Sequence, residues 1–409
     1  MSEDTKKIAE KEIHNTLRFC NFFIRNVGLS FVDEIPTTYF KKIFVLGYFV
    51  AALSLILLIL IGEHAYIIYI FHNLVSLEQL IGSNLHIIGY GIISFGKLLT
   101  LWYKKNTFRQ VVKELADIWP VAETNAKAVA IKNSSLKSLR SIEILYVFLN
   151  VIGVSFYTLT PVALHIYRLT RGIPTDLGYV WQLYYPFDQT KPVVHELVYM
   201  YEIFAGMACV SCMLGCDVFF ITMASHISML LRILQVKITS IGTPDGDKLV
   251  RESLDCYDEI VAVVKIHQRL IRYGNDLEDA FAVVNLINVL LSSVDICCVM
   301  FTIVFLDPVM EVSSKFFLGA ALTQMGIVCW YADDIFTTSL GVSDAVYESG
   351  WYNCDIRSRR ALLLMLERSQ RPLYFTALKF SPITLNTYRS ILTTSYSYFT
   401  LLYTAYRQN

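Results

Sequence analysis

The chain has 409 residues, of which 55% are hydrophobic and 17% are charged, and its formal net charge is zero. Soluble domains carry about 25% charged residues. This length and composition therefore indicate a polytopic membrane protein rather than two soluble domains, and no nucleic-acid partner is expected. The first residues contain no apolar core followed by a small-residue cleavage site, so no cleaved signal peptide is expected either.

Seven apolar blocks are close to the length of about 20 residues that a helix needs to cross a bilayer. The second and seventh blocks are more polar than the others and contain Lys97 and Arg389. Lys97 lies close to Trp102 and to the end of its block, so we expect its ammonium group to snorkel to the membrane boundary. The predicted spans are 43–62, 80–101, 142–167, 196–223, 281–306, 316–337 and 383–406.

The distribution of Lys and Arg between these spans predicts the orientation. The N-terminal segment and every second loop after it contain 28 Lys and Arg residues, whereas the segments on the opposite side contain five. Positive charge concentrates on the cytoplasmic side of membrane proteins. The N-terminus is therefore predicted to be cytoplasmic and the C-terminus extracellular. This is the reverse of G-protein-coupled receptors, whose Asp-Arg-Tyr and Asn-Pro-x-x-Tyr motifs are also missing at the corresponding spans.

The fold class expected is an all-α membrane protein of seven transmembrane helices whose cytoplasmic extensions form an anchor region. Within the N-terminal segment, apolar residues at helical spacing over 13–27 predict an amphipathic helix lying on the inner leaflet. The loop 168–195 is aromatic and contains prolines, so it is expected to be an ordered lid. The predicted parts are the cytoplasmic segment 1–42, spans one to four with the lid (43–223), spans five and six with the anchor (224–382), and the last span with the extracellular C-terminus (383–409).

Catalytic and cofactor motifs do not stand out. His195-Glu196 resembles the start of a zinc-protease motif but lacks the second His at i+4. Cys209-x-x-Cys212 lies in an apolar run, where packing is the expected role of cysteine. The protein is therefore expected not to be an enzyme and to hold neither metal nor cofactor. Asp295 lies inside the fifth predicted span, where it either hydrogen-bonds to a neighbouring helix or belongs to an ion pathway.

The last span contains a row of hydroxyl groups. At 100° per residue these residues fall on one helix face about 80° wide. We call them the hydroxyl stripe: Ser390, Thr393, Ser397, Thr400 and Thr404. Leu401 borders the stripe, and aromatic residues repeat on another side. The stripe either lets helices approach within one subunit or lines a water-filled pore in which Leu401 forms a dewetting constriction.

Three stretches resemble insect odorant receptors, and the resemblance extends over most of the chain. They are YYPFDQTKPVVHELVYMYE (184–202), SDAVYESGWYNCDIRSRRALLLMLERSQRPL (343–373) and SPITLNTYRSILTTSYSYFTLLY (381–403). The resemblance implies a ligand-gated, non-selective cation channel in which four subunits surround one pore. It also implies that the seventh spans line the pore and that the cytoplasmic ends of spans four to seven form the anchor. The Ser-Tyr-Ser-Tyr sequence is typical of a ligand-specific subunit rather than of the shared co-receptor.

The partners implied are the odorant-receptor co-receptor, a small volatile odorant, membrane lipid and permeating cations, in the plasma membrane of olfactory sensory neurons. Carrying over the family pattern places the hydrophobic gate at Leu401, a polar position at Thr404 and the outer constriction at Ala405. The hydroxyl stripe adds Ser397 and Thr400 to the residues expected to face the pore. The ligand pocket is expected in the outer halves of spans two, three, four and six. The candidates are Tyr90, Ser155, Phe156, Tyr157, Phe204, Met207, Thr323, Gln324 and Ile327.

Two alternatives remain open at this point. One is a gustatory-type channel that assembles without the co-receptor, although the terminal Ser-Tyr-Ser-Tyr sequence disfavours it. The other is a seven-span signalling receptor that has no pore.

Overall fold

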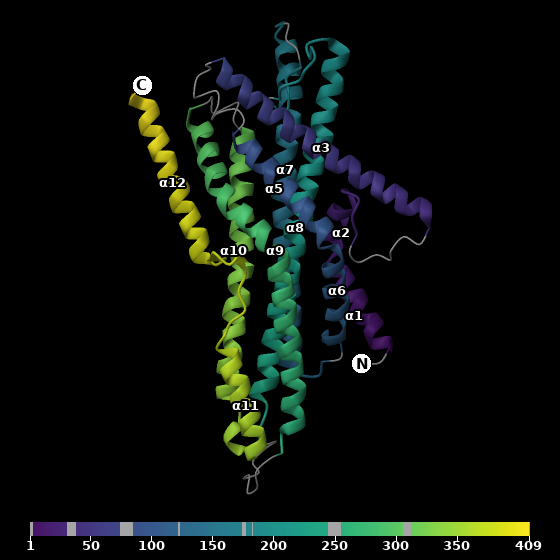
Figure 1. The fold of residues 1–409 in the computed structure, drawn as a ribbon, viewed down its shortest axis with the longest axis vertical. Coiled ribbons are helices and arrows are strands. Elements are labelled where there is room, and N and C mark those ends of the chain that lie inside the picture. The colour runs from purple at the N-terminus through teal and green to yellow at the C-terminus, as the bar shows by residue number, and fades with distance from the viewer. Residues whose placement is uncertain are drawn as a thin grey trace.

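The computed structural model describes residues 3–30, 38–73, 85–121, 123–173, 177–181, 183–243, 255–305 and 312–408. Most of the long helices run along a common bundle, α3 (Tyr39–His72) crosses it obliquely, and α12 (Leu385–Gln408) stands at its edge (Figure 1). The α-helices are α1 (Glu3–Thr16), α2 (Arg18–Arg25), α3 (Tyr39–His72), α5 (Leu85–Tyr103), α6 (Lys105–Leu115), α7 (Ala126–Thr170), α8 (Pro192–Thr239), α9 (Tyr257–Phe305), α10 (Val312–Glu348), α11 (Ile356–Ser369) and α12 (Leu385–Gln408). Two short 3-10 helices, η1 (Ala116–Ile118) and η2 (Trp351–Asn353), follow α6 and α10.

Each of the seven predicted spans coincides with one of the helices α3, α5, α7, α8, α9, α10 and α12. Five of these, α3 and α7 to α10, are long and apolar enough to cross a membrane, and the apolar part of α5 is shorter. The predicted start of the second span at residue 80 lies outside the described residues. As the sequence indicates, α12 is the most polar member of the set. The described part of α5 is among the more apolar members, so the expectation of a more polar second span is not confirmed for residues 85–103.

Two helices at the centre of the fold are much longer than a bilayer requires. Helices α8 and α9 have 48 and 49 residues, which at about 1.5 Å per residue corresponds to roughly 70 Å. The hydrocarbon core of a bilayer is about 30 Å thick. The additional turns extend toward the end of the bundle that carries α11 (Figure 1). There the backbone N–H of Gly350 donates to the carbonyl oxygen of Ile241 at 2.8 Å, which joins the end of α8 to the end of α10.

Helix α8 forms the centre of the bundle. It is apolar on all sides, and its side chains from Ala208 to Leu231 are almost all buried, as expected for a helix surrounded by other helices. It packs against α2, α3, α5, α7, α9 and α10. At Gly215 an added Cβ atom would lie 2.8 Å from Cγ1 of Ile24, so the absence of a side chain there lets α2 approach closely.

One face of the N-terminal helices is covered by the protein. The apolar residues that predict an amphipathic helix over 13–27 are all at most 1% exposed within the protein: Ile13, Leu17, Cys20, Ile24 and Val27. The thiol of Cys20 donates to the carbonyl oxygen of Gly215 on α8 at 3.6 Å. The helical periodicity is therefore confirmed, but the expectation that this face rests on the inner leaflet is wrong, because α8 covers it.

Helix α12 follows a small hairpin that is the only departure from an all-α fold among the described residues. Strands β1 (Thr376–Ala377) and β2 (Ser381–Pro382) pair antiparallel, with Thr376 opposite Pro382. The backbone N–H of Leu378, in the turn of the hairpin, donates to the carbonyl oxygen of Ala282 on α9 at 3.2 Å. The hairpin thus fixes the start of α12 beside α9.

Candidate functional site

A partly enclosed cavity lies between α3, α5, α7, α8, α9 and α10. It contains about 60 Å³ of space that the centre of a water-sized molecule can reach. Most of its wall is aliphatic or aromatic, and the rings of Tyr90, Tyr157 and Phe317 meet there, with Phe317 5.6 Å from Tyr90 and 6.3 Å from Tyr157 between ring centroids. An apolar cavity with a few inward polar groups is the usual form of a small-molecule site.

Two carboxyl groups lie in the wall of this cavity, on Glu63 of α3 and Asp295 of α9. Glu63 is 1% exposed, and neither of its side-chain oxygens has a hydrogen-bond partner within the described chain. The carboxyl group of Asp295 lies so close to Gly89 on α5 that a Cβ atom at Gly89 would overlap it. A buried polar group without a partner costs free energy, so the Glu63 carboxyl group is a point at which a ligand could hydrogen-bond.

A loop residue closes the cavity on one side. Trp181 lies in the wall, and its ring stacks on Tyr157 with the centroids 5.5 Å apart. The backbone N–H groups of Val180 and Trp181 donate to Oε2 of Glu202 at 2.8 and 3.2 Å, and the hydroxyl of Tyr185 donates to Oε1 at 3.1 Å. Glu202 is fully buried. Its carboxylate therefore holds this part of the 168–195 loop over the cavity.

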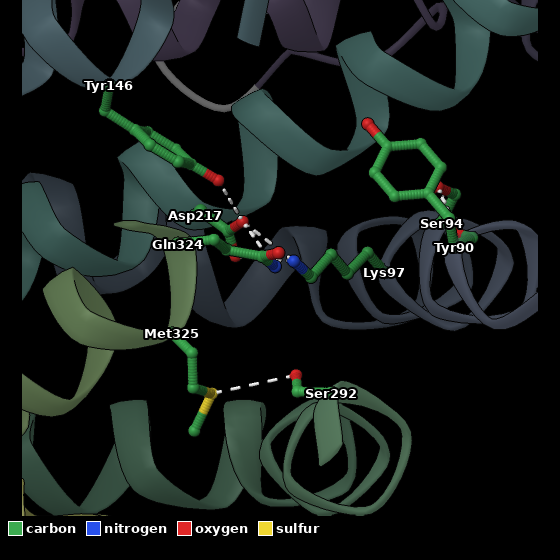
Figure 2. Close-up of polar contacts among 8 residues, drawn as sticks. All are labelled: Tyr90, Ser94, Lys97, Tyr146, Asp217, Ser292, Gln324 and Met325. Atoms are coloured by element: carbon green, nitrogen blue, oxygen red, sulfur yellow. Dashed lines mark hydrogen bonds and ion pairs between the residues drawn. The ribbon is translucent and has the colours of Figure 1, made fainter. Parts of the chain in front are cut away.

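A polar cluster lies beside the cavity (Figure 2). The ammonium of Lys97 donates to both carboxylate oxygens of Asp217 on α8, at 2.7 and 2.8 Å. The hydroxyl of Tyr146 and the amide of Gln324 donate to Oδ2 of Asp217 at 2.8 and 3.1 Å. Gln324 also lines the cavity. Any ligand that displaces the Gln324 side chain therefore disturbs a buried network that joins α5, α7, α8 and α10.

The position of Lys97 differs from the sequence-based expectation. Its side chain is fully buried rather than directed toward the membrane boundary. The snorkelling interpretation is wrong because Asp217, which is 120 residues away in the sequence, supplies a carboxylate directly beside the ammonium group.

Three of the nine candidate ligand-binding residues line the cavity: Tyr90, Tyr157 and Gln324. Phe204 and Met207 lie on the outer surface of α8, 56% and 55% exposed. Phe156 stacks on Phe316 outside the cavity wall, with centroids 4.4 Å apart. The remaining three, Ser155, Thr323 and Ile327, are also absent from the wall in the described structure, and the hydroxyls of the first two donate to carbonyl oxygens of their own helices.

Several cavity residues were not among those candidates. Trp181 comes from a loop, and Glu63 directly follows the first apolar block, where an acid ordinarily marks the end of a span. Asp295 was singled out as an acid within a span but not as part of the pocket. For Trp181 the available signal was the aromatic, proline-containing loop itself, whereas nothing in the sequence distinguishes Glu63 from a boundary residue.

Helix α12 presents its hydroxyl stripe away from its own bundle. Ser390, Thr393, Ser397 and Thr404 are exposed and Thr400 is half-buried. Leu401, beside the stripe, is 68% exposed, and Ala405 is exposed as well. The stripe hydroxyls donate to carbonyl oxygens of α12 itself, for example Thr404 to Thr400 at 2.8 Å.

The aromatic side of α12 makes its contact with the bundle. The ring of Tyr406 lies 4.5 Å from that of Phe305 and 5.7 Å from that of Phe301 on α9, between centroids. Tyr403 also contacts Phe305. Within the described chain, aromatic packing rather than the hydroxyl stripe therefore attaches this part of α12 to α9.

Comparison with known proteins identifies the architecture. A family model described as "7tm Odorant receptor" matches residues 78–396. The chain belongs to the insect odorant receptor family. The members of this family are odorant-gated channels rather than enzymes, and this odorant receptor is accordingly a multi-pass membrane protein.

Individual relatives agree with this assignment. Odorant receptor 85c of Drosophila melanogaster is 27% identical over 328 residues, which cover 78% of this chain and 81% of the relative. Putative odorant receptor 85d of the same species is 24% identical over 99% of this odorant receptor and 98% of its own length. The structure of olfactory receptor OR5 from Machilis hrabei in complex with eugenol superposes with a TM-score of 0.83, at 16% identity, over 97% of this chain and 99% of the relative. This match shows that the fold is shared.

Proposed function

We propose that this odorant receptor is the ligand-specific subunit of a heteromeric cation channel that it forms with the co-receptor in the plasma membrane of olfactory sensory neurons. The observation that carries the proposal is the apolar cavity within the bundle, with its few inward polar groups. Its wall contains no Lys or Arg in the described structure and is mostly apolar, so it offers no partner to an anion and suits a largely apolar small molecule. The Machilis hrabei relative was solved with eugenol, which supports a volatile organic ligand for this chain too.

The ligand proposed for the cavity carries a hydrogen-bonding group. Glu63 has two carboxyl oxygens without a partner in the described chain, and Gln324 lies in the same wall. A site built to hydrogen-bond a polar group discriminates strongly against an analogue that lacks it, because the buried polar atoms are then left unpaired. An alcohol, phenol or carbonyl compound should therefore activate the receptor more strongly than a hydrocarbon of the same size.

The orientation proposed places the N-terminus in the cytoplasm and the C-terminus outside, as the Lys and Arg distribution predicts. The cavity then lies in the outer half of the bundle, and α11 lies on the cytoplasmic side. At the α11 end, large apolar side chains are exposed on the single chain, including Ile356 (68%), Leu363 (63%) and Leu364 (68%). Exposed apolar patches of this kind mark protein–protein contacts, which supports a tetramer anchored at this end.

The pore proposed is lined by α12. Its hydroxyl stripe and Leu401 face away from the subunit, as a helix around a central axis shared by four subunits requires. Hydroxyl groups suit a hydrated cation, and an apolar side chain such as Leu401 closes a narrow pore by dewetting. The remaining pore assignments, Thr404 as the polar position and Ala405 as the outer constriction, belong to the same proposal.

Membrane current tests the proposal. The receptor is expressed alone and with the co-receptor, and currents are recorded during exposure to a panel of volatiles that includes size-matched alcohol and hydrocarbon pairs. We expect odorant-evoked cation current only from the co-expressed pair, and without G-protein signalling. Current from this chain alone would instead support a gustatory-type channel. A C-terminal epitope that is detectable only after permeabilisation would contradict the orientation and both channel interpretations.

A further inference from the structure

A second concave surface lies outside the ligand cavity, where the end of α2, the first turns of α3 and the junction between α5 and α6 meet. This groove has a volume of about 800 Å³. One part of it is cationic, with Arg25, Lys42, Lys105 and Arg109 in the wall. The other part is apolar and contains aromatic side chains, among them Phe44 of α3.

On both sides of the groove, the cations lie at the end of an apolar helical segment. On α3 the pair Lys41–Lys42 comes immediately before the apolar run that begins at Ile43. On the other side, the apolar helix α5 ends at Tyr103, and Lys104–Lys105 follows it. Trp102 lies in the same wall, with Nζ of Lys105 5.6 Å from its ring centroid. Trp beside Lys at the end of an apolar helix is typical of the headgroup level of a bilayer.

The cationic part offers charge and hydrogen-bond donors to an anion. No carboxylate lies in the groove wall of the described chain. Arg109 is positioned by one hydrogen bond, from Nη2 to the carbonyl oxygen of Ser30 at 3.0 Å, while its buried Nε has no partner among the described residues. The Lys42 side chain is exposed. Two lysines and a guanidinium arranged in this way are suited to a phosphate group.

The apolar part is exposed to the surroundings of the bundle. On α3, Phe44 is 75% exposed and Tyr48, which follows one turn later, is 47% exposed. Both lie in the most apolar helix of the chain, a candidate membrane span. Hydrocarbon is the environment that such a surface requires, which favours a lipid over a soluble anion or a polar protein segment as the occupant.

We propose that this groove binds an anionic phospholipid. Its headgroup phosphate lies against Lys42, Lys105 and Arg109, and its acyl chains run along Phe44 and Tyr48 of α3. The positive-inside distribution predicts that this boundary faces the cytoplasm, and the cytoplasmic leaflet is the one that carries anionic lipid. The lipid would join α2, α3 and the α5–α6 junction. This site is separate from the odorant cavity, and its existence does not depend on channel activity.

Quenching of Trp102 by brominated lipid measures occupancy directly. The full-length receptor is reconstituted into phosphatidylcholine vesicles that contain the same minor fraction of either brominated phosphatidylglycerol or brominated phosphatidylcholine. Trp102 is 42% exposed. We expect the anionic lipid to quench the fluorescence more strongly than the zwitterionic lipid at the same mole fraction. The Trp102→Phe variant should lose this additional quenching by the anionic lipid. That loss would show that Trp102, out of the five tryptophans of the chain, is the one that the lipid quenches.

Charge variants then identify the binding residues. Lys42→Gln/Lys105→Gln should weaken the preference for the anionic lipid by about fivefold per lysine removed. Lys11→Gln/Lys113→Gln removes the same charge from two exposed lysines outside the groove and should leave the preference unchanged. Equal quenching by the two lipids would overturn the proposal. The proposal would also be overturned if the additional quenching by the anionic lipid persisted in Trp102→Phe or in Lys42→Gln/Lys105→Gln. The same holds if the control variant lost this additional quenching to the same extent.

Discussion

Lys97 and Asp217 form an ion pair that is buried inside the helix bundle. Nζ of Lys97 lies 2.7 and 2.8 Å from the two carboxylate oxygens of Asp217, and the two side chains are 0% and 5% exposed. Tyr146 and Gln324 complete the hydrogen bonds of this carboxylate. Because Gln324 also belongs to the cavity wall, the pair connects the core of α5 and α8 with the proposed odorant site.

Removing only the cation of this pair should destabilise the receptor severely. Lys97→Met leaves Asp217 without its counter-charge, and breaking a buried pair on one side costs about 3–5 kcal/mol. We expect a clear fall in the thermal unfolding temperature of the purified protein, measured by fluorescence-detected size exclusion after heating. The variant Lys97→Met/Asp217→Asn, which removes both charges but keeps an acceptor for Tyr146, should recover most of the loss. If the double variant is no more stable than the single one, the pair is not the cause.

Two substitutions in neighbouring helices separate the cavity from the outer surface. Tyr157 lines the cavity and stacks on Trp181, whereas Met207 is 55% exposed on the far side of α8. In the co-expressed channel, Tyr157→Ala should shift the odorant concentration for half-maximal current at least tenfold, which corresponds to about 1.4 kcal/mol. Met207→Ala serves as the control and should leave the dose response unchanged at equal surface expression. The opposite pattern would move the odorant site to the outer face of α8.

The loop over the cavity can be released by one substitution. Glu202→Ala removes the acceptor of the backbone N–H groups of Val180 and Trp181 and of the Tyr185 hydroxyl. Each donor left unpaired in a buried site costs about 1–3 kcal/mol. Trp181 should therefore be held less firmly against the cavity, by its stacking on Tyr157 and by the hydrogen bond from its Nε1 to the backbone carbonyl oxygen of residue 202. We expect the current to decay about tenfold faster after odorant washout. Glu196→Ala, at an exposed position of the same helix, is the matched control, and equal decay in both variants would rule out a role for this loop in ligand retention.

The constriction proposed at Leu401 predicts a leak. Leu401→Ala removes apolar surface that would otherwise dewet the pore, so the current without odorant should rise severalfold in the co-expressed channel. Tyr396→Ala, which truncates a 62% exposed residue on another side of α12, provides the comparison. An unchanged resting current in Leu401→Ala, at normal surface expression, would mean that another residue or the co-receptor closes the pore.

The seven hydrophobic blocks and their spacing were sufficient to predict the helices. Each block coincides with a helix, because about 20 apolar residues can satisfy their backbone in a membrane only by forming one. The periodicity of residues 13–27 and the two sides of α12 also followed from the sequence. Residues three or four apart lie on the same face of a helix, and this does not depend on what packs against that face. The periodicity does not tell whether protein or lipid covers a helix face. For residues 13–27 the apolar face is covered by protein and not, as expected, by lipid.

The cavity depended on the tertiary structure. Met207 and Gly206 are adjacent in the sequence, yet Gly206 lines the cavity and Met207 lies outside. Successive residues of an α-helix point in directions about 100° apart around the helix axis. A helical wheel gives the angle between two residues but not the direction in which the helix is turned. That rotation is set by packing against neighbouring helices.

By itself the sequence determined the family, the number and positions of the long helices, and the surplus of positive charge on alternate segments. These properties are local or additive, so they can be read along the chain. Only the tertiary structure decided that Lys97 meets Asp217, that Glu63 and Asp295 face one cavity, and that Trp181 closes it. Each of these contacts joins residues far apart in the sequence, and its free energy depends on which groups the fold brings within a few ångströms of each other.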